Sequence, residues 1–368
     1  MSISRITAGV FRPLCEEIIQ ALGEIGISNL TIASARSPII EAGGIFGGHR
    51  IIDDPINLFS LLVPSEVECQ VLSRIISVGK LNLPGRGWAC SEEIKLPQDS
   101  NSGIINSVNI EPVQTNEDPG DFTGIICIVQ RGQGNNVGRV ALDMGTCVPS
   151  VTFGTGLGIR DKMGLLRVTI PAEKEIIWAI STSQDAEIVF NGMIEAGQLD
   201  QPGKGFIYMF PLKQAHINME VSRGILPNSA ATPEQIIVAI DGILGGIKWR
   251  QRDSVGNIPN ERTFLTGLLD FTLICNEGSS DDLVSAAMTA GAAGASIAKV
   301  NEVNPAESFR GGIVKPSARE VCYMIINNDT MWDIIEALET AACFTDEHNG
   351  VVVTSETIKA FTYLPSNK

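Results

Sequence analysis

Two glycine-rich turns hold the residues of this sequence that are best suited to binding chemistry. The first runs Gly79-Lys-Leu-Asn-Leu-Pro-Gly85-Arg86-Gly87-Trp88, and the second runs Gly197-Gln-Leu-Asp-Gln-Pro-Gly203-Lys204-Gly205-Phe206, 118 residues later. Because glycine adopts both signs of φ, the N–H groups of such a turn can converge on an anion beside a cation. The pattern therefore predicts two anion-binding cradles, formed by Gly79, Gly85, Arg86, Gly87, Gly197, Gly203, Lys204 and Gly205.

A purely structural interpretation of these turns remains open. Pro-Gly is common wherever a helix turns into a strand, and a lysine on such a turn is normally solvated. The repetition of the pattern raises the weight of the binding interpretation without excluding the structural one.

Two further glycine-containing loops are candidates for contact with a protein partner. Residues 37–56 include Gly47, Gly48, His49 and Arg50, and residues 154–164 include Arg160. Loops longer than a sheet connection needs are usually functional or disordered. The Gly-x-Gly-x-Gly run at 154–158 superficially matches a dinucleotide fingerprint, but no βαβ crossover follows it, so Rossmann binding is rejected.

The sequence holds little that points to catalysis or to a metal. It contains no G-x-S-x-G, H-E-x-x-H or phosphate-binding P-loop motif, and its three histidines lie far apart. The eight cysteines sit in apolar stretches without a C-x-x-C pair, which predicts reduced core thiols and a cytosolic compartment. We therefore predict a non-enzymatic protein that needs no cofactor and holds no metal.

Composition excludes several classes of partner. With 42 acidic against 27 basic residues the chain carries a net charge of −15, which disfavours binding to nucleic acid or to anionic lipid over the whole surface. There is no run of 18 apolar residues and no apolar leader, so neither a membrane span nor a signal peptide is expected. A local anion site remains compatible with this charge.

The elements around the first glycine turn predict one compact unit. Residues 5–11 are expected to form a strand, 14–25 an amphipathic helix, 30–35 and 57–63 two strands, the stretch after Pro64 a second helix, and 88–94 a fourth strand. This βαββαβ order is that of the ferredoxin-like fold, an antiparallel four-stranded sheet with two helices on one face. It fits in about 100 residues.

The same order recurs twice along the chain. In the second unit we expect strands at 124–130, 150–153, 165–170 and 206–211, with helices at 136–144 and 173–195, so that Pro171 matches Pro64. A third, degenerate unit has strands at 270–275, 296–302, 321–327 and 350–354, with helices at 279–290 and 331–341. The predicted division is residues 1–97, 122–213 and 268–363, with a linker at 214–267 that holds a helix at 233–244.

The second glycine turn and the opening of the first unit resemble the nitrogen-regulatory P-II signalling family. The turn Gly197 to Pro211 is similar to that family's Thr-Gly-x-x-Gly-Asp-Gly-Lys-Ile-Phe-Val segment, and Glu17 to Ile32 is similar to its first helix and second strand. The loop that ends Gly47-Gly48-His49-Arg50 sits where the family has its long T-loop. The resemblance implies trimers that bind ATP or ADP between subunits, which would make this three-unit chain a pseudo-trimer.

The leading hypothesis is thus a P-II-like regulatory protein that senses a small anionic ligand, most simply an adenine nucleotide, in clefts between its units. It would report through loops 37–56 and 154–164. A structural or shell-like assembly protein without a ligand is the alternative, and an enzyme with an unrecognised site is the third. The sequence does not identify the ligand, the partner or the pathway.

Overall fold

The computed structural model describes residues 2–42, 49–83, 85–97, 104–110, 121–144, 147–158, 172–217, 262–311 and 316–364. Its first unit comprises β1 (Ile3–Phe11), α1 (Cys15–Glu24), β2 (Leu30–Ala42), β3 (His49–Pro64), α2 (Glu68–Val78) and β4 (Gly87–Ile94). The second comprises β5 (Phe122–Gln130), α3 (Gly134–Asp143), β6 (Ser150–Gly158), β7 (Glu173–Thr182), α5 (Ala186–Gly197) and β8 (Gly205–Leu212). The third comprises β10 (Leu268–Asn276), α7 (Ser280–Thr289), β11 (Gly294–Val303), α8 (Pro305–Phe309), β12 (Ser317–Asn327), α9 (Met331–Thr340) and β13 (Val351–Glu356).

All three units pair their strands antiparallel and in the same order. The orders are β4-β1-β3-β2, β8-β5-β7-β6 and β13-β10-β12-β11. The register is also repeated, because Ile6 faces Leu61 and Ser91, Ile125 faces Ala179 and Met209, and Phe271 faces Met324 and Thr354, each pair of partners being 30 residues apart. The prediction of an α+β fold built on antiparallel sheets is confirmed, and each unit has the order βαββαβ.

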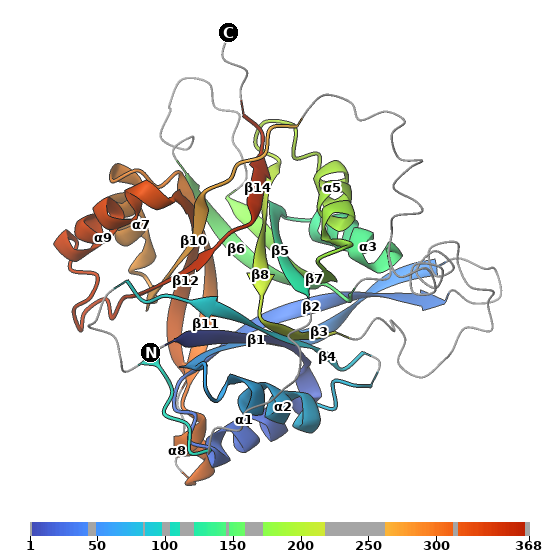
Figure 1. The fold of residues 1–368 in the computed structure, drawn as a ribbon, viewed down its shortest axis with the longest axis vertical. Coiled ribbons are helices and arrows are strands. Elements are labelled where there is room, and N and C mark those ends of the chain that lie inside the picture. Colours follow the sequence, from blue (N-terminus) through green and yellow to red (C-terminus); the bar gives the residue numbers. More distant parts are fainter. Residues whose placement is uncertain are drawn as a thin grey trace.

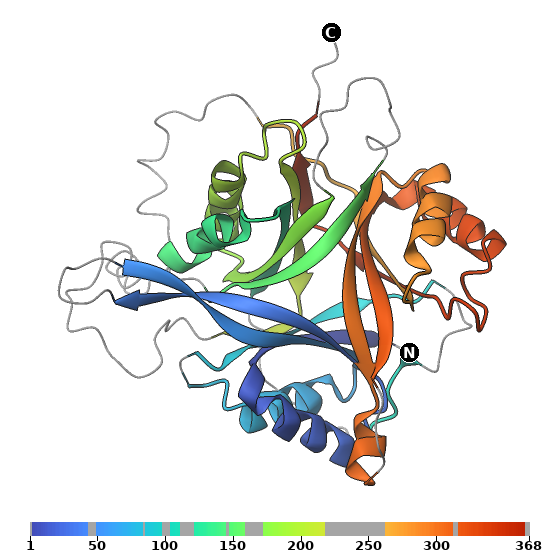
Figure 2. The ribbon, with the colours of Figure 1, turned by 180° about the vertical axis from the view of Figure 1, so that it is seen from behind.

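The three sheets join through their second strands into a closed ring. The middle of β2 pairs with the early part of β6 (Ala35 with Thr152), the late part of β6 with the early part of β11 (Thr155 with Ile297), and the late part of β11 with the early part of β2 (Asn301 with Ile32). Figures 1 and 2 show the three helix pairs α1/α2, α3/α5 and α7/α9 at the outer corners, with the strands between them.

The chain that leaves each unit's fourth strand crosses to another unit. Lys213 N donates to Ser91 O at 2.8 Å, and the short strand β9 (Gln214–His216) then pairs with β4. In the same way Ile358 N donates to Met209 O at 2.7 Å and β14 (Lys359–Thr362) pairs with β8, while Lys95 N donates to Thr354 O at 2.8 Å. Each unit therefore contributes a tail to the sheet of another.

The strands are buried on both faces, because alternate side chains point to different cores. In β7, Ile177 and Ala179 pack against α3 and α5, whereas Ile176, Trp178 and Ile180 point to a central core where the three sheets face one another. Each unit also has its own core between sheet and helices. A strand that is buried on both sides reads as a continuous apolar run.

Because of such a run, the prediction of a helix at 173–195 in the second unit is wrong. Residues 173–182 form β7, and only 186–197 are helical. Thr182, not Pro171, occupies the place of Pro64, because both residues pair with the first residue of their unit's first strand. The strand predicted at 165–170 and the helix predicted at 233–244 lie outside the described residues.

The two predicted loops are also shorter than expected. β2 continues to Ala42 and β3 begins at His49, so most of the segment 37–56 is a paired hairpin, and β6 likewise continues to Gly158. Of the eight thiols, seven are buried and Cys69 is partly exposed, as expected for core cysteines. None of the described helices is long and apolar enough to cross a membrane.

Candidate functional site

The first glycine turn connects α2 to β4 and lets β4 approach β1 closely. Gly87 has φ +130°, and a Cβ added there would lie 1.9 Å from the carbonyl oxygen of Gly9. In the second turn, a Cβ on Gly205 would lie 2.2 Å from the oxygen of Ile128. The last glycine of each turn is therefore needed by backbone packing, whatever else the turn binds.

Several polar atoms of the two turns bond within the protein. Arg86 N donates to Leu83 O at 3.3 Å, and Lys204 N donates to Gln201 O at 3.4 Å. The Arg86 guanidinium lies over the ring of Phe11, 5.7 Å from its centroid. One backbone amide of each turn, that of Arg86 and that of Lys204, is therefore already hydrogen-bonded within its turn.

The first turn lies at the junction between the first and second units. A cavity of about 20 Å³ is lined there by Gly85, Gly87 and Trp88 of the first unit and by Ser150 of the second, with Asp54 from the hairpin β2–β3. Trp88 Nε1 donates to Ser150 Oγ at 2.8 Å across the junction. The structure therefore brings Gly85 and Gly87 to a cleft between units.

The hairpin beside this junction is held to the second unit by charge. Arg36 on β2 donates to Glu175 on β7 at 2.9 Å and lies 3.3 Å from Asp53 on β3. Glu175 also accepts the backbone N–H groups of Gly132 and Gly134 at the start of α3, at 3.0 and 2.6 Å. The base of the hairpin is thereby fixed to the neighbouring unit.

The predicted partner-loop residues are only partly within the described chain. His49 and Arg50 are the first residues of β3, where they pair with Ala42 and Glu41 of β2. Gly47, Gly48 and Arg160 lie outside the described residues. Gly79 is the C-cap residue that follows α2, and Gly197 is the last residue of α5. In the third unit Gly350 occupies the place of Gly87 and Gly205, immediately before β13.

A buried charge network on the first strands was missed by the sequence reasoning. Arg5 donates to Glu92 at 2.8 Å and to Thr272 Oγ1 at 3.3 Å, and lies 3.5 Å from Asp270. Tyr208 donates to Asp270 at 3.0 Å. Burial raises the pKa of Glu92 despite the nearby Arg5, and burial together with the charge of Asp270 raises the pKa of Tyr208. The network joins all three units.

A second missed cluster joins the second unit to the first. Glu68 on α2 is 1% exposed and accepts hydrogen bonds from Ser4, Ser91 and Lys213. Lys213, which follows β8, also donates to Ser4 Oγ at 3.1 Å. The equivalent cluster positions of the second unit hold Thr123 in place of Ser4 and Ala186 in place of Glu68, so this ion pair is specific to one junction.

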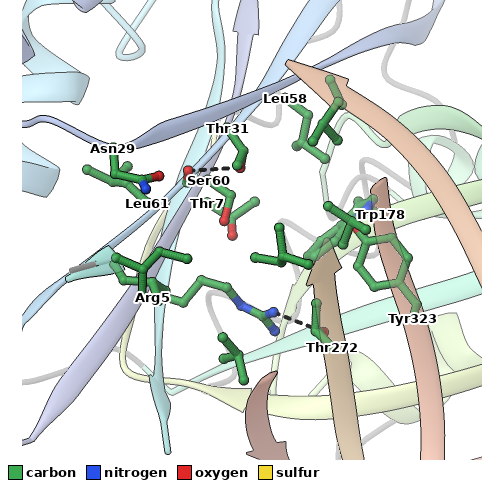
Figure 3. Close-up of a pocket in the computed structure, with 17 residues that line it drawn as sticks. Arg5, Thr7, Asn29, Thr31, Leu58, Ser60, Leu61, Trp178, Thr272 and Tyr323 are labelled. Carbon is green, nitrogen blue, oxygen red and sulfur yellow. Dashed lines mark hydrogen bonds between the residues drawn. The ribbon is translucent and has the colours of Figure 1, made fainter. Parts of the chain in front are cut away.

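Among the described residues, no group of three or more His, Cys, Asp or Glu side chains is placed to hold a metal ion. A cavity with a volume of about 50 Å³ lies between the three sheets. It is lined by residues of all three units, with Thr7, Thr31 and Ser60 on one side, Trp178 and Tyr323 opposite, and Arg5 with Thr272 below them (Figure 3).

Comparison with known proteins does not assign a family. No family model and no curated protein matches the chain. Among solved structures, aspartate kinase from Synechocystis is similar with a TM-score of 0.24 and 8% identity, over 97% of this chain and 44% of the kinase chain. The chain thus spans less than half of that structure, and at this similarity neither the kinase's fold nor its activity transfers to it.

Proposed function

We propose that the chain is a P-II-like single-chain pseudo-trimer with a regulatory function, which binds a small anionic ligand between its first two units. The observation that carries the proposal is the ring of second strands, in which the three βαββαβ units pair with the same register at each junction. Closed cyclic symmetry is the usual arrangement of trimers, and fusion of the units replaces association by high effective concentration. A cytosolic location, supported by the buried thiols, is part of the proposal.

The first glycine turn is the best-supported ligand site. Arg86 lies between Gly85 and Gly87, which line the cavity at the junction with the second unit, and Asp54 lines the same cavity. Because a carboxylate repels a phosphate, the anion is expected beside Arg86 and not inside the cavity. The second turn offers Lys204 in the same position, whereas the third unit has Asp346 and Glu347 before Gly350.

The hairpin β2–β3 is the element through which binding would be reported. Ser37 and Asp54, near its base, line the same cavity as Gly85, and Arg36 ties that base to Glu175. A ligand that alters the cleft would therefore act on the contacts that fix the hairpin. Binding energy can shift a conformational equilibrium only by its difference between the two states.

Calorimetric titration with ATP, ADP, AMP, cyclic AMP and bicarbonate tests the proposal. A charge-assisted contact to phosphate is worth about 1.5 to 3 kcal/mol, so Arg86→Ala with Lys204→Ala should weaken nucleotide binding by roughly tenfold or more. Arg139→Ala is the matched control, because Arg139 is exposed on α3 and pairs only with Asp143 among the contacts described. Binding that is absent for every ligand, or unchanged in the double variant, would refute the site.

The alternative is an assembly protein without a small ligand, and the small volume of the junction cavity favours it. A space of about 20 Å³ holds little more than one water molecule. Light scattering separates the two functions, because the pseudo-trimer should remain a monomer of 39.3 kDa while an assembly protein would form larger particles.

A further inference from the structure

The cavity between the three sheets exists because one unit lacks an aromatic side chain that the other two have. Ser60, Trp178 and Tyr323 occupy equivalent positions on the third strands of their units. They pair with Thr31, Ser150 and Ser296 of the second strands, respectively. The rings of Trp178 and Tyr323 fill the parts of the central core next to the second and third units, and their centroids lie 6.5 Å apart, edge to face. Ser60 is too small to fill the corresponding part next to the first unit, and the cavity of about 50 Å³ lies there.

Two residues that line this cavity carry buried polar atoms without a hydrogen-bond partner among the described residues. Thr7 is 2% exposed and Trp178 is 4% exposed, yet among the described residues neither Thr7 Oγ1 nor Trp178 Nε1 has a hydrogen-bond partner. Buried polar groups in native proteins are nearly always satisfied by protein or by another molecule. A dry apolar cavity would not account for these two groups.

The charge around the cavity restricts what could occupy it. Arg5 lines the space, but its guanidinium is already bound by Glu92 and faces Asp270, so the positive charge is balanced by two carboxylates. An anion entering here would meet an excess of negative charge in a poorly solvated place. Uncharged molecules avoid that cost.

We infer that the central cavity is a binding site for a small uncharged molecule that both donates and accepts hydrogen bonds, of the primary amide or urea class. Each water-sized atom needs about 10–15 Å³ of such space, so the cavity takes about four non-hydrogen atoms. In the proposed complex the carbonyl oxygen of the ligand accepts from the Trp178 indole and its N–H group donates to Thr7. Both side chains must move slightly for this, because neither polar atom is exposed to the empty cavity. This site is separate from the glycine turns and does not depend on the function proposed for them.

The affinity is bounded by size. Four atoms at the best ligand efficiencies correspond to a dissociation constant no tighter than about tens of micromolar. Acetamide and acetate make a matched pair of probes, because they have the same shape and differ in charge. Acetamide should appear in the cavity of soaked crystals and should raise the melting temperature in solution, and acetate should do neither.

Three variants test the site. Ser60→Phe fills the space as Trp178 and Tyr323 do and should weaken acetamide binding at least tenfold, whereas Ser60→Ala keeps the space and should bind within about threefold of wild type. Should Ser60→Phe fail to fold, Thr7→Val preserves shape and should weaken binding about fivefold. Because Thr7 Oγ1 lacks a partner in the ligand-free protein, Thr7→Val should not lower its melting temperature.

The inference would be overturned by any of several outcomes. They are crystals that show only water in the cavity, acetamide binding at crystal concentration only, and equal binding by wild type, Ser60→Phe and Thr7→Val. Preference for acetate over acetamide would also contradict it, since it would show that the carboxylates do not set the charge of the site.

Discussion

Substituting Gly87 by alanine distinguishes close backbone packing from ligand binding as the reason for the glycine turns. The new Cβ would lie 1.9 Å from Gly9 O and 2.9 Å from Gly9 C, at a φ of +130°. Ordinary contacts between carbon and oxygen are about 3.3 Å or longer. Strand β4 must therefore withdraw from β1 by more than about 1 Å, or the turn must rearrange.

The expected cost combines two effects. A non-glycine residue held at such a φ costs about 1–3 kcal/mol, and displacing packed backbone costs about another 1–3 kcal/mol. The reduced freedom of the unfolded chain returns about 0.4–1 kcal/mol. Gly87→Ala should therefore lower the free energy of unfolding by about 3–4 kcal/mol.

Gly132→Ala is the control, because Gly132 has φ +88° but no atom within 4 Å of its added Cβ. It should lose only about 1 kcal/mol, from backbone strain alone. Urea unfolding followed by tryptophan fluorescence measures both values, with Trp88 adjacent to Gly87 as a reporter. Equal losses for the two variants, or a loss below about 1 kcal/mol for Gly87→Ala, would refute the steric argument.

Two further predictions concern buried charge and thiols. Arg5→Met should cost about 3–5 kcal/mol at neutral pH, because it leaves two buried carboxylates unpaired. Because the folded pKa of Glu92 is raised, its protonated form favours the folded state: this contribution is full below the unfolded pKa and is lost as the pH rises through the folded pKa. The destabilisation by Arg5→Met should therefore be smaller near pH 4.5 than at neutral pH. A destabilisation that does not depend on pH would contradict this. Cys69, the partly exposed thiol, should react first with Ellman's reagent, because the other thiols are buried and burial raises the pKa of a thiol such as that of Cys127. Cys69→Ser should remove the fast phase of the reaction, and persistence of that phase would disprove the assignment.

The repeat and the order of its elements could be predicted from the sequence, because the glycine turn marks the same place in two units. The error at Glu173–Thr182 arose because Ile176 to Ile180 is continuously apolar, and such a run does not distinguish a strand buried on both faces from a buried helix. The third unit was predicted well even without its turn. There the helices and strands are short and well marked in the sequence, as at α7 and β11.

The charged residues of the interior could not be predicted, because their partners are far away in the sequence. Arg5 meets Asp270 only when the first and third units close on each other, and Lys213 reaches Glu68 only through the tail of the second unit. One signal was available. Once the units are aligned, Arg5 and Asp270 fall at the same position of their first strands, with opposite charge, on the strand face that points to the common centre.

The exchange of tails between units leaves few strand edges unpaired. An exposed sheet edge offers N–H and C=O groups to other chains and promotes aggregation. Here the inner edges β2, β6 and β11 pair with one another, and the outer edges β4 and β8 are covered by β9 and β14. Because β14 lies on β8, damage at the C-terminal end of the chain would uncover the second unit, so the integrity of one unit protects another from self-association.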